Sequence, residues 1–465
     1  MHPVLASDLA RLPLLLRETC EQATAFLEGL EDRPVVPASH EVSMIPLPDH
    51  GRGLQEAAED FHRRWEPFLS ASAGPRYLGF VTGGATPAAL AGDWLTAATD
   101  QNSMSRLDSG GQQLEREVVS WLRQMFGLSP VHHGNLVSGA TMSNTVGLAV
   151  AREWLGERLG VSPAEAGNAS LGHVRVLSGS AHSSVAKALS LLGLGRTALA
   201  PVGNREGREA VDLAALERAL SQIDGPCIVV ANAGTVNTGD FDNIQAVADL
   251  RARYEFWLHV DAAFGAFAAL SPDSKHLLRG LDLADSVCVD LHKWLNVPYD
   301  SAVQFTRRQD LQTRVFQNAA AYLGSANDLD SLHLTPENSH RLRALAAWFT
   351  LRAYGREGHR EIVERCMSCA RLLAETIDAT PGLRTLAPVR LNVVCFTLTD
   401  NPTPGQLAAL AGELSGEVFL TPTLLDGVPA LRAAFSNWRT TETDVSRIAD
   451  ALRRALPRYL HKEAR

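Results

Sequence analysis

The sequence predicts an α/β fold with a doubly wound, largely parallel sheet, and two observations lead to it. Short apolar runs alternate with amphipathic helical stretches between about residues 76 and 350. The runs are continuously apolar, which is typical of strands that helices cover on both faces. The expected strands are 174–177, 227–231, 256–260 and 287–289, with helices at 183–194 and 243–254. Ligands of such sheets bind beyond the carboxyl ends of the strands.

Two smaller units flank this region. Residues 1–75 have apolar positions at helical spacing, broken by prolines, and predict a helical segment for packing or for an interface. Residues 76–350 form the large domain of the prediction. A long helix then leads into a small α+β domain over 351–465, with strands expected at 391–396 and 431–435.

Composition excludes several classes of protein. The 465 residues are 45% hydrophobic and 20% charged, as in globular proteins, and the net charge of −9 argues against nucleic-acid binding. No apolar run is long enough for a membrane span, and Asp8 and Arg11 interrupt the N-terminus where a signal peptide needs an apolar core. We therefore expect a cytoplasmic protein with no membrane or nucleic-acid partner.

The six cysteines are too few and too scattered for a disulfide framework in a chain of this length. Cys366 and Cys369 form a CxxC pair, but they lie in a strongly helical pattern with no second cysteine or histidine pair at metal-ligand spacing. We interpret them as packing residues and predict no metal site.

The end of the strand at 287–289 carries a candidate nucleophile. Lys293 follows it, between His292 and Trp294. Burial favours the free amine of a lysine, and the free amine is the form that makes a Schiff base with an aldehyde. Most lysines near strand ends instead extend to solvent, so Lys293 alone does not decide the question.

The other strand ends supply matching parts. Asp261 follows the strand at 256–260, where a carboxylate could keep a pyridine nitrogen protonated or simply cap the next turn. His182 could stack on a planar ring or be a partly buried structural histidine. Gly234–Gly239, which includes Thr235, is a loop of small polar residues, and 138–144 places glycine and hydroxyl residues at a helix start that suits phosphate. Together they predict a site for an aldehyde cofactor.

With these segments the chain resembles the pyridoxal-phosphate-dependent group II decarboxylases. The resemblance spans nearly the whole chain and is carried by 138–141, 182–184, 234–239, 241–243, 259–263, 290–294 and 436–442. It implies the fold type I architecture of aspartate aminotransferase, with an N-terminal helical segment packed on a partner subunit. It also implies a homodimer with the active site at the interface.

The resemblance also implies roles for single residues. Lys293 would hold pyridoxal 5′-phosphate as a Schiff base, and Asp261 would face the pyridine nitrogen. His182 would stack on the ring, His292 would lie near the substrate carboxylate, and Ala263 would pack beneath the ring. Ala140 and Thr141 would bind the phosphate, with Thr235 also at the cofactor. The implied reaction is release of CO2 from an L-amino acid through an external aldimine and a quinonoid.

The chain departs from the family in the loop that follows. In aromatic-type members a mobile loop supplies a tyrosine that protonates the intermediate, whereas 323–336 contains none. His333 is the only near-neutral proton donor there, unless it is simply a solvated loop histidine. Without rapid protonation oxygen could intercept the reaction, so an aldehyde-forming oxidase is an alternative to the decarboxylase. Another lyase or a transferase of the same fold is a further alternative.

The substrate pocket is also ambiguous. Arg106 and Asp108 lie where the family usually carries pocket residues contributed across the dimer, and they make this wall less apolar. Phe80 and Trp294 would lie nearby by analogy and would suit an aromatic substrate. The sequence does not choose the amino acid.

Overall fold

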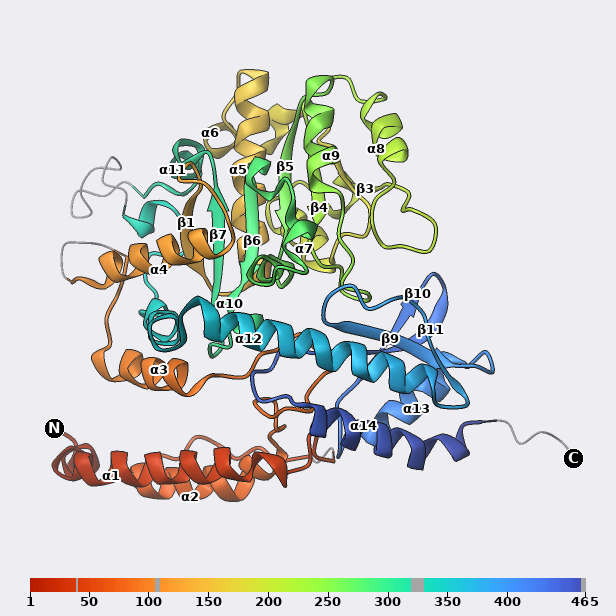
Figure 1. Ribbon diagram of the computed structural model, residues 1–465. Coiled ribbons are helices and arrows are strands. Elements are labelled where there is room, and N and C mark those ends of the chain that lie inside the picture. The colour runs from red at the N-terminus through yellow and green to blue at the C-terminus, as the bar shows by residue number, and fades with distance from the viewer. Residues whose placement is uncertain (39–40, 105–108, 319–329, 461–465) are drawn as a thin grey trace, which may run out of the picture.

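The computed structural model describes residues 1–38, 41–104, 109–318 and 330–460, and Figure 1 shows their arrangement. A seven-stranded sheet forms the centre, in the order β1-β7-β6-β5-β4-β2-β3. Neighbours from β3 to β6 pair in parallel, and β7 runs antiparallel to both β6 and β1. The strand bounds are β1 His133–Val137, β2 Val176–Ser178, β3 Leu199–Pro201, β4 Cys227–Asn232, β5 Phe256–Asp261, β6 Ser286–Asp290 and β7 Ala302–Thr306. The predicted α/β class with a mostly parallel sheet is confirmed.

Successive strand residues face opposite sides of this sheet, as the two-residue period of a strand requires. Ile228 and Val230 pack with α5 (Ala140–Leu159) and α7 (Ser183–Leu191) in one buried cluster. Val229 and Leu258 belong to the cluster on the other face, which includes α8 (Leu213–Leu220), α9 (Ile244–Asp249) and α4 (Gly111–Met125). Apolar residues all round the strands therefore reflect helices on both faces.

The second sheet is small and antiparallel, in the order β10-β11-β9-β8. Its strands are β8 Leu383–Thr385, β9 Val393–Leu398, β10 Thr421–Leu425 and β11 Val428–Ala434, with helices α13 (Pro404–Leu414) and α14 (Glu442–Ala455). The long helix α12 (Ala344–Asp378) runs from the large sheet to this unit, with α3 (Pro87–Thr99) packed on it (Figure 1). The boundary expected at 350–351 falls within α12, which bends at Gly355 (φ 57°).

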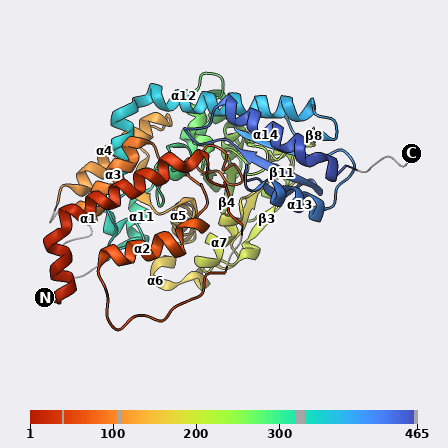
Figure 2. The same cartoon turned by 90° about the horizontal axis from the view of Figure 1, so that it is seen from below.

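The N-terminal helices lie apart from both sheets, as Figure 1 shows, and Figure 2 views the molecule from their side. α1 (Pro3–Glu28) contacts α2 (Leu54–Arg64), where Asp8 Oδ2 accepts a hydrogen bond from the Leu54 N–H at 3.0 Å. Leu15 is the buried residue of α1, whereas Leu5, Leu9 and Leu16 are 56–60% exposed. Among the described helices, none combines the length and the apolar character that a membrane crossing requires.

Candidate active site

Lys293 lies just beyond the carboxyl end of β6, in the short helix α10 (Leu291–Trp294). Its Nζ atom is 3.3 Å from Asp290 Oδ2 and 5.7 Å from the centre of the Phe264 ring. The side chain is 19% exposed, so the amine is largely enclosed yet still reachable. The structure thus holds this amine between a carboxylate and an aromatic face.

The backbone around Lys293 is held in place by contacts with Gly83, a residue far upstream in the sequence. The Gly83 N–H donates to the His292 carbonyl at 3.2 Å, and Asn296 Nδ2 donates to the Gly83 carbonyl at 2.6 Å. A Cβ atom at Gly83 would overlap the carbonyl oxygen of Lys293 and the amide of Asn296. Glycine is therefore required here by close approach of two backbones.

We expect Gly83→Ala to destabilise the fold and displace Lys293, because backbone rather than a flexible side chain blocks the added methyl. Overpacking of this kind costs roughly 3 kcal/mol or more. Urea unfolding measures the loss. Gly412→Ala is the control, since a Cβ there meets nothing within 4 Å. Equal stabilities of the two variants would contradict the prediction.

Asp261 ends β5, the strand next to β6. Its Oδ2 accepts a hydrogen bond from Asn144 Nδ2 at 2.9 Å, and its Oδ1 accepts one from the Ala263 N–H at 3.2 Å. The residue is 6% exposed. Two donors thus hold this carboxyl group in place, and a carboxylate here could face a cationic heterocycle.

His182 stands at the start of α7, and its side chain caps that helix. Its Nδ1 lies 2.8 Å from Ser184 Oγ and accepts from the Ser184 N–H at 3.3 Å. Ser184 in turn accepts from Asn144, the residue that also holds Asp261. Partial desolvation lowers the pKa of His182, although much of its surface faces solvent in the isolated chain. A neutral imidazole is thus tied to the same amide as Asp261.

The N-terminus of α5 is where we expect the phosphate to bind. The Ala140 N–H donates to Asp290 Oδ1 at 3.1 Å, while the Thr141 and Met142 N–H groups have no partner among the described residues. A Cβ atom on Gly139 would meet only His292 Cε1, at 3.7 Å, so space remains in front of the helix. Free N–H groups, an open approach and the helix dipole together suit a phosphate group.

Lysine, carboxylate, histidine and phosphate cradle are therefore brought to one edge of the sheet. Cys288 joins them, because Cys288 pairs with Asp261 across β5 and β6 and its Sγ lies 3.5 Å from the Ala140 carbonyl. The set fits pyridoxal 5′-phosphate: an amine for the aldehyde, N–H groups for the phosphate and an anion for the pyridinium.

His292 and Asp290 add a second pair beside the lysine. His292 Nδ1 is 3.2 Å from Asp290 Oδ1, and the His292 ring lies 4.4 Å from the ring of Tyr299. Burial is the largest influence on His292 and lowers its pKa, against the opposing effect of Asp290. Burial also raises the pKa of Tyr299 to about 12. Both groups are therefore neutral at pH 7.

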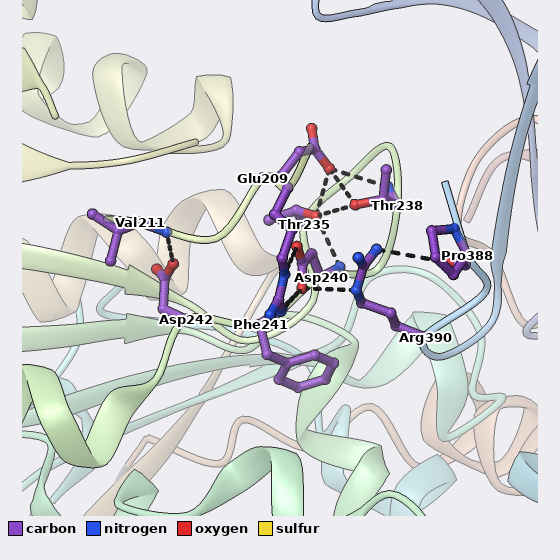
Figure 3. Close-up of polar contacts among 10 residues, drawn as sticks. Glu209, Val211, Thr235, Thr238, Asp240, Phe241, Asp242, Pro388 and Arg390 are labelled. Atoms are coloured by element: carbon purple, nitrogen blue, oxygen red, sulfur yellow. Dashed lines mark hydrogen bonds and ion pairs between the residues drawn. The ribbon is translucent and has the colours of Figure 1, made fainter. Parts of the chain in front are cut away.

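Thr235 belongs to a different cluster of hydrogen bonds, which Figure 3 shows. Its hydroxyl donates to Glu209 Oε2 at 2.6 Å and accepts from the Asp240 N–H at 2.9 Å. Thr238 donates to the same carboxylate, and Asp240 pairs with Arg390 at 3.3 Å. These bonds commit the Thr235 side chain to shaping the loop and joining it to the small domain, so direct cofactor binding by Thr235 stays a prediction.

The remaining predicted residues are scattered. Trp294 is completely buried and packs on Phe267, so its side chain lies in the core and does not line an opening. His333 is 1% exposed, and its Nδ1 accepts from the Asn318 N–H at 3.1 Å. It is therefore a buried residue in this chain and not a solvated loop histidine. Arg106 lies outside the described residues, as does Asp108.

Phe80 is accessible, with 51% of its surface exposed. Its ring contacts Phe419 at 5.3 Å and Tyr77 at 6.4 Å, and Tyr77 acts electrostatically on Tyr299. We call Tyr77, Phe80, Tyr299 and Phe419 the aromatic cluster. It borders His292 through Tyr299, which places an open aromatic surface beside the candidate lysine.

Several site residues were not assigned from the sequence: Asn144, His259, Asp290, Tyr299 and Phe419. Asn144 lies in the glycine- and hydroxyl-rich segment 138–144 and Asp290 in the segment 290–294, but neither residue type points to a separate role. His259 offered a usable signal, because it is an ionisable residue inside an otherwise apolar strand. Phe419 is distant in sequence and offered none.

We expect the stability of the protein to fall between about pH 6.5 and pH 4 in part through His259. Burial lowers the pKa of His259 to about 4, while Asp261, the charged group that faces it, opposes the shift. Below pH 6.5 the unfolded chain binds a proton that the folded chain refuses, so acid favours unfolding. The slope is at most about 1.4 kcal/mol per pH unit. Urea unfolding of wild type and His259→Gln should show a shallower slope for the variant, and identical slopes would contradict this.

Comparison with known proteins gives the family. Residues 40–399 match the model of the pyridoxal-dependent decarboxylase conserved domain. An aromatic-L-amino-acid decarboxylase of Sus scrofa is 29% identical over 96% of this chain and 95% of its own length. An L-2,4-diaminobutyrate decarboxylase of Acinetobacter baumannii is 29% identical over 70% and 68%.

The fold agrees with this assignment. The crystal structure of Oryza sativa TDC with PLP and tryptamine superposes with a TM-score of 0.90 at 22% identity, over 99% of this chain and 100% of that one. The Rhodiola rosea 4-hydroxyphenylacetaldehyde synthase structure has a TM-score of 0.86 at 21% identity, over 97% and 99%. From the matched domain, the chain belongs to the pyridoxal-dependent decarboxylase family and is a carboxy-lyase that uses pyridoxal 5′-phosphate.

Proposed function

We propose that this enzyme removes CO2 from an aromatic L-amino acid and releases the corresponding amine. The observation that carries the proposal is the aromatic cluster beside His292. Phe80 and Tyr299 are 51% and 59% exposed, although large aromatic side chains gain by burial. A substrate ring placed against them would cover this surface. Relatives named as aromatic-L-amino-acid decarboxylases support the choice.

The proposed roles follow the geometry of the site. Lys293 Nζ would hold the cofactor covalently, the Thr141 and Met142 N–H groups would bind its phosphate, and Asp261 would hold its ring nitrogen as a cation. When bound, pyridoxal 5′-phosphate supplies an electron sink for the bond that breaks at the substrate Cα. His182 would lie over the ring and Ala263 beneath it.

Asp290 and His292 would control protons around the lysine. The Asp290 carboxylate lies 3.3 Å from Lys293 Nζ and 3.2 Å from His292 Nδ1, within ion-pair distance of both. A neutral His292 beside it has one ring nitrogen that donates and one that accepts. We propose that this pair returns Lys293 to its neutral form after each turnover.

We also propose that the active unit is a homodimer. Leu5, Leu9 and Leu16 leave an apolar face of α1 exposed in the single chain, and Phe61 and Trp65 in and after α2 are exposed as well. Exposed apolar surface of this extent is typical of a protein–protein interface. Sedimentation of the purified enzyme would measure the assembly, and a monomer at micromolar concentration would contradict it.

A substrate screen tests the activity. Purified enzyme with cofactor would be given aromatic amino acids, 2,4-diaminobutyrate and glutamate, and CO2, ammonia and hydrogen peroxide would be measured together. The proposal expects CO2 from aromatic substrates without peroxide. CO2 from 2,4-diaminobutyrate or glutamate alone would overturn the substrate class.

An aldehyde-forming oxidase is the second candidate, and two observations favour it. Residues 323–336 contain no tyrosine, and His333 is buried with its Nδ1 already bonded. This loop of the same chain therefore offers no evident acid to protonate the substrate carbon after CO2 is lost. Stoichiometric peroxide and ammonia alongside CO2 would establish this alternative in place of amine release.

Phe80→Ala should raise the KM for an aromatic substrate about tenfold and change kcat little. The ring supplies apolar contact shared by bound substrate and transition state, and one such contact is worth roughly 1–3 kcal/mol in a pocket. Steady-state kinetics of CO2 release measure both constants. Leu191→Ala, which removes a 65% exposed apolar side chain at the end of α7, is the control. An unchanged KM for Phe80→Ala would remove the aromatic cluster from the pocket.

A further inference from the structure

A chain of buried hydrogen bonds runs from the middle of the large sheet to the cofactor site. Trp257 Nε1 donates to Ser286 Oγ at 2.9 Å, and Ser286 Oγ lies 2.8 Å from His259 Nδ1. His259 Nε2 lies 2.8 Å from Asn144 Oδ1. All four residues are at most 1% exposed. The proposed chemistry gives His259 no role, yet it is an ionisable group enclosed beneath the site.

From Asn144 the chain divides. The Asn144 amide nitrogen lies 2.9 Å from Asp261 Oδ2 and 3.1 Å from Ser184 Oγ. Ser184 Oγ then lies 2.8 Å from His182 Nδ1. One side-chain amide therefore connects His259 to both groups that would contact the cofactor ring.

The two ends of this chain fix the direction of its hydrogen bonds. An indole N–H can only donate, so Ser286 Oγ accepts from Trp257 and its own proton is left for His259 Nδ1. At the other end an ionised Asp261 can only accept, so Asn144 must point its NH2 group there. The Asn144 carbonyl then faces His259 Nε2, which must carry a proton.

His259 is consequently a neutral imidazole with its proton on Nε2. A cation would place a second donor against Ser286 Oγ and leave the hydroxyl proton of Ser286 without the acceptor that His259 Nδ1 provides. Burial lowers the pKa of His259 to about 4, in agreement with this state. Helix α5 packs closely against the ring, because a Cβ atom on Gly147 would lie only 2.8 Å from His259 Cε1.

The same reasoning determines the tautomer of His182. Both hydrogens of the Asn144 amide are used, one on Asp261 and one on Ser184. Ser184 Oγ accepts that bond and gives its own proton to His182 Nδ1, where the Ser184 N–H also points. His182 Nδ1 is therefore an acceptor, and the neutral ring carries its proton on Nε2.

We propose that His259 is a positioning residue of the cofactor site: its Nε2–H orients the Asn144 amide, which in turn holds Asp261 and sets His182 as the Nε2–H tautomer. His182 accordingly offers a donor from its outer nitrogen. A donor there matches an anionic oxygen of the cofactor or of the substrate carboxylate. If the Asn144 amide were flipped, it could neither donate to Asp261 nor set the tautomer of His182.

Tautomers can be observed directly by ¹⁵N–¹H correlation NMR of enzyme labelled at histidine. The signals of His259 and His182 are assigned by their loss in His259→Gln and His182→Gln. At neutral pH, without and with cofactor, the proposal expects both rings neutral with the proton on Nε2. A proton on Nδ1 of either ring, or a cationic His259, would overturn it, and this readout needs no catalysis.

Cofactor affinity supplies the second test. Asn144→Asp keeps the shape but replaces the amide donor with a carboxylate against Asp261, and it should weaken cofactor binding at least about tenfold in an absorbance titration. The control is Gln312→Glu, which makes the same change at a buried amide of α11 that donates to the Leu334 carbonyl. Gln312→Glu should lose stability but keep its affinity for the cofactor.

His259→Gln and His259→Phe separate the hydrogen bond that His259 makes to Asn144 from the packing of its ring. Glutamine retains an amide donor for the Asn144 carbonyl, whereas phenylalanine retains only the ring. The proposal expects affinity near wild type for glutamine and loss for phenylalanine. Wild-type affinity in Asn144→Asp, or equal losses in Asn144→Asp and Gln312→Glu, would overturn the positioning role. If Asn144→Asp does not fold, the tautomers of the wild-type enzyme decide the matter.

Discussion

Lys293→Ala is expected to lower the rate of CO2 release roughly 10⁴-fold, the scale on which removal of a covalent catalytic group acts. The amine is the group that would bind the cofactor aldehyde, and its surroundings suit that task. It is 19% exposed and lies between the Asp290 carboxylate and the Phe264 ring. Alanine removes the amine and leaves the backbone contact with Gly83 intact, so the fold should persist.

Borohydride reduction followed by peptide mapping measures the attachment itself. The chain contains only four lysines, Lys187, Lys275, Lys293 and Lys462, so a reduced adduct is readily located. We expect label on Lys293 in wild type and none at that position in the variant. Lys187→Ala, on the exposed side of α7, is the control and should retain both label and rate. Label on another lysine in active wild-type enzyme would disprove the assignment.

The place of Lys293 in the site could be predicted from local sequence, because the position of a residue at the end of its strand determines that place. The carboxyl ends of parallel neighbours meet at one edge, so an aspartate at the end of β5 and a lysine after β6 must be close once both runs are recognised as strands. The antiparallel strand β7 was not predicted. It carries Gln304 and Thr306, both fully buried, and buried polar residues remove the apolar signal by which a central strand is recognised.

Side-chain direction separates residues that a sequence motif places together. Trp294 and Lys293 are adjacent, but one turn of α10 sends the tryptophan into the core against Phe267 and the amine toward Asp290. Thr235 lies in the expected loop, yet the distant Glu209 takes its hydroxyl (Figure 3). A motif gives residue type and approximate place. The partner that captures a side chain depends on tertiary packing, which a single sequence does not show.

The second large effect is expected at Asp261. Asp261→Asn should lower kcat about 10²- to 10³-fold, because it removes the charge that would hold the ring nitrogen as a cation, and single preorganised electrostatic groups act on this scale. The local geometry adds to the loss. Both carboxyl oxygens already accept, from Asn144 Nδ2 and from the Ala263 N–H, so an amide NH2 must face one of these donors.

Asp242→Asn is the matched control for this variant. Asp242 is also buried and also accepts at both oxygens, from the Val211 N–H at 2.6 Å (Figure 3) and from the Asn232 N–H at 2.7 Å. Loss of a buried acceptor should therefore destabilise both variants by a similar amount, roughly 1–3 kcal/mol in urea unfolding. Only Asp261→Asn should lose kcat in the cofactor-saturated enzyme. If the two variants lost stability equally and kept equal kcat, Asp261 would be a structural carboxylate like Asp242, and the electrostatic role would have to lie elsewhere in the site.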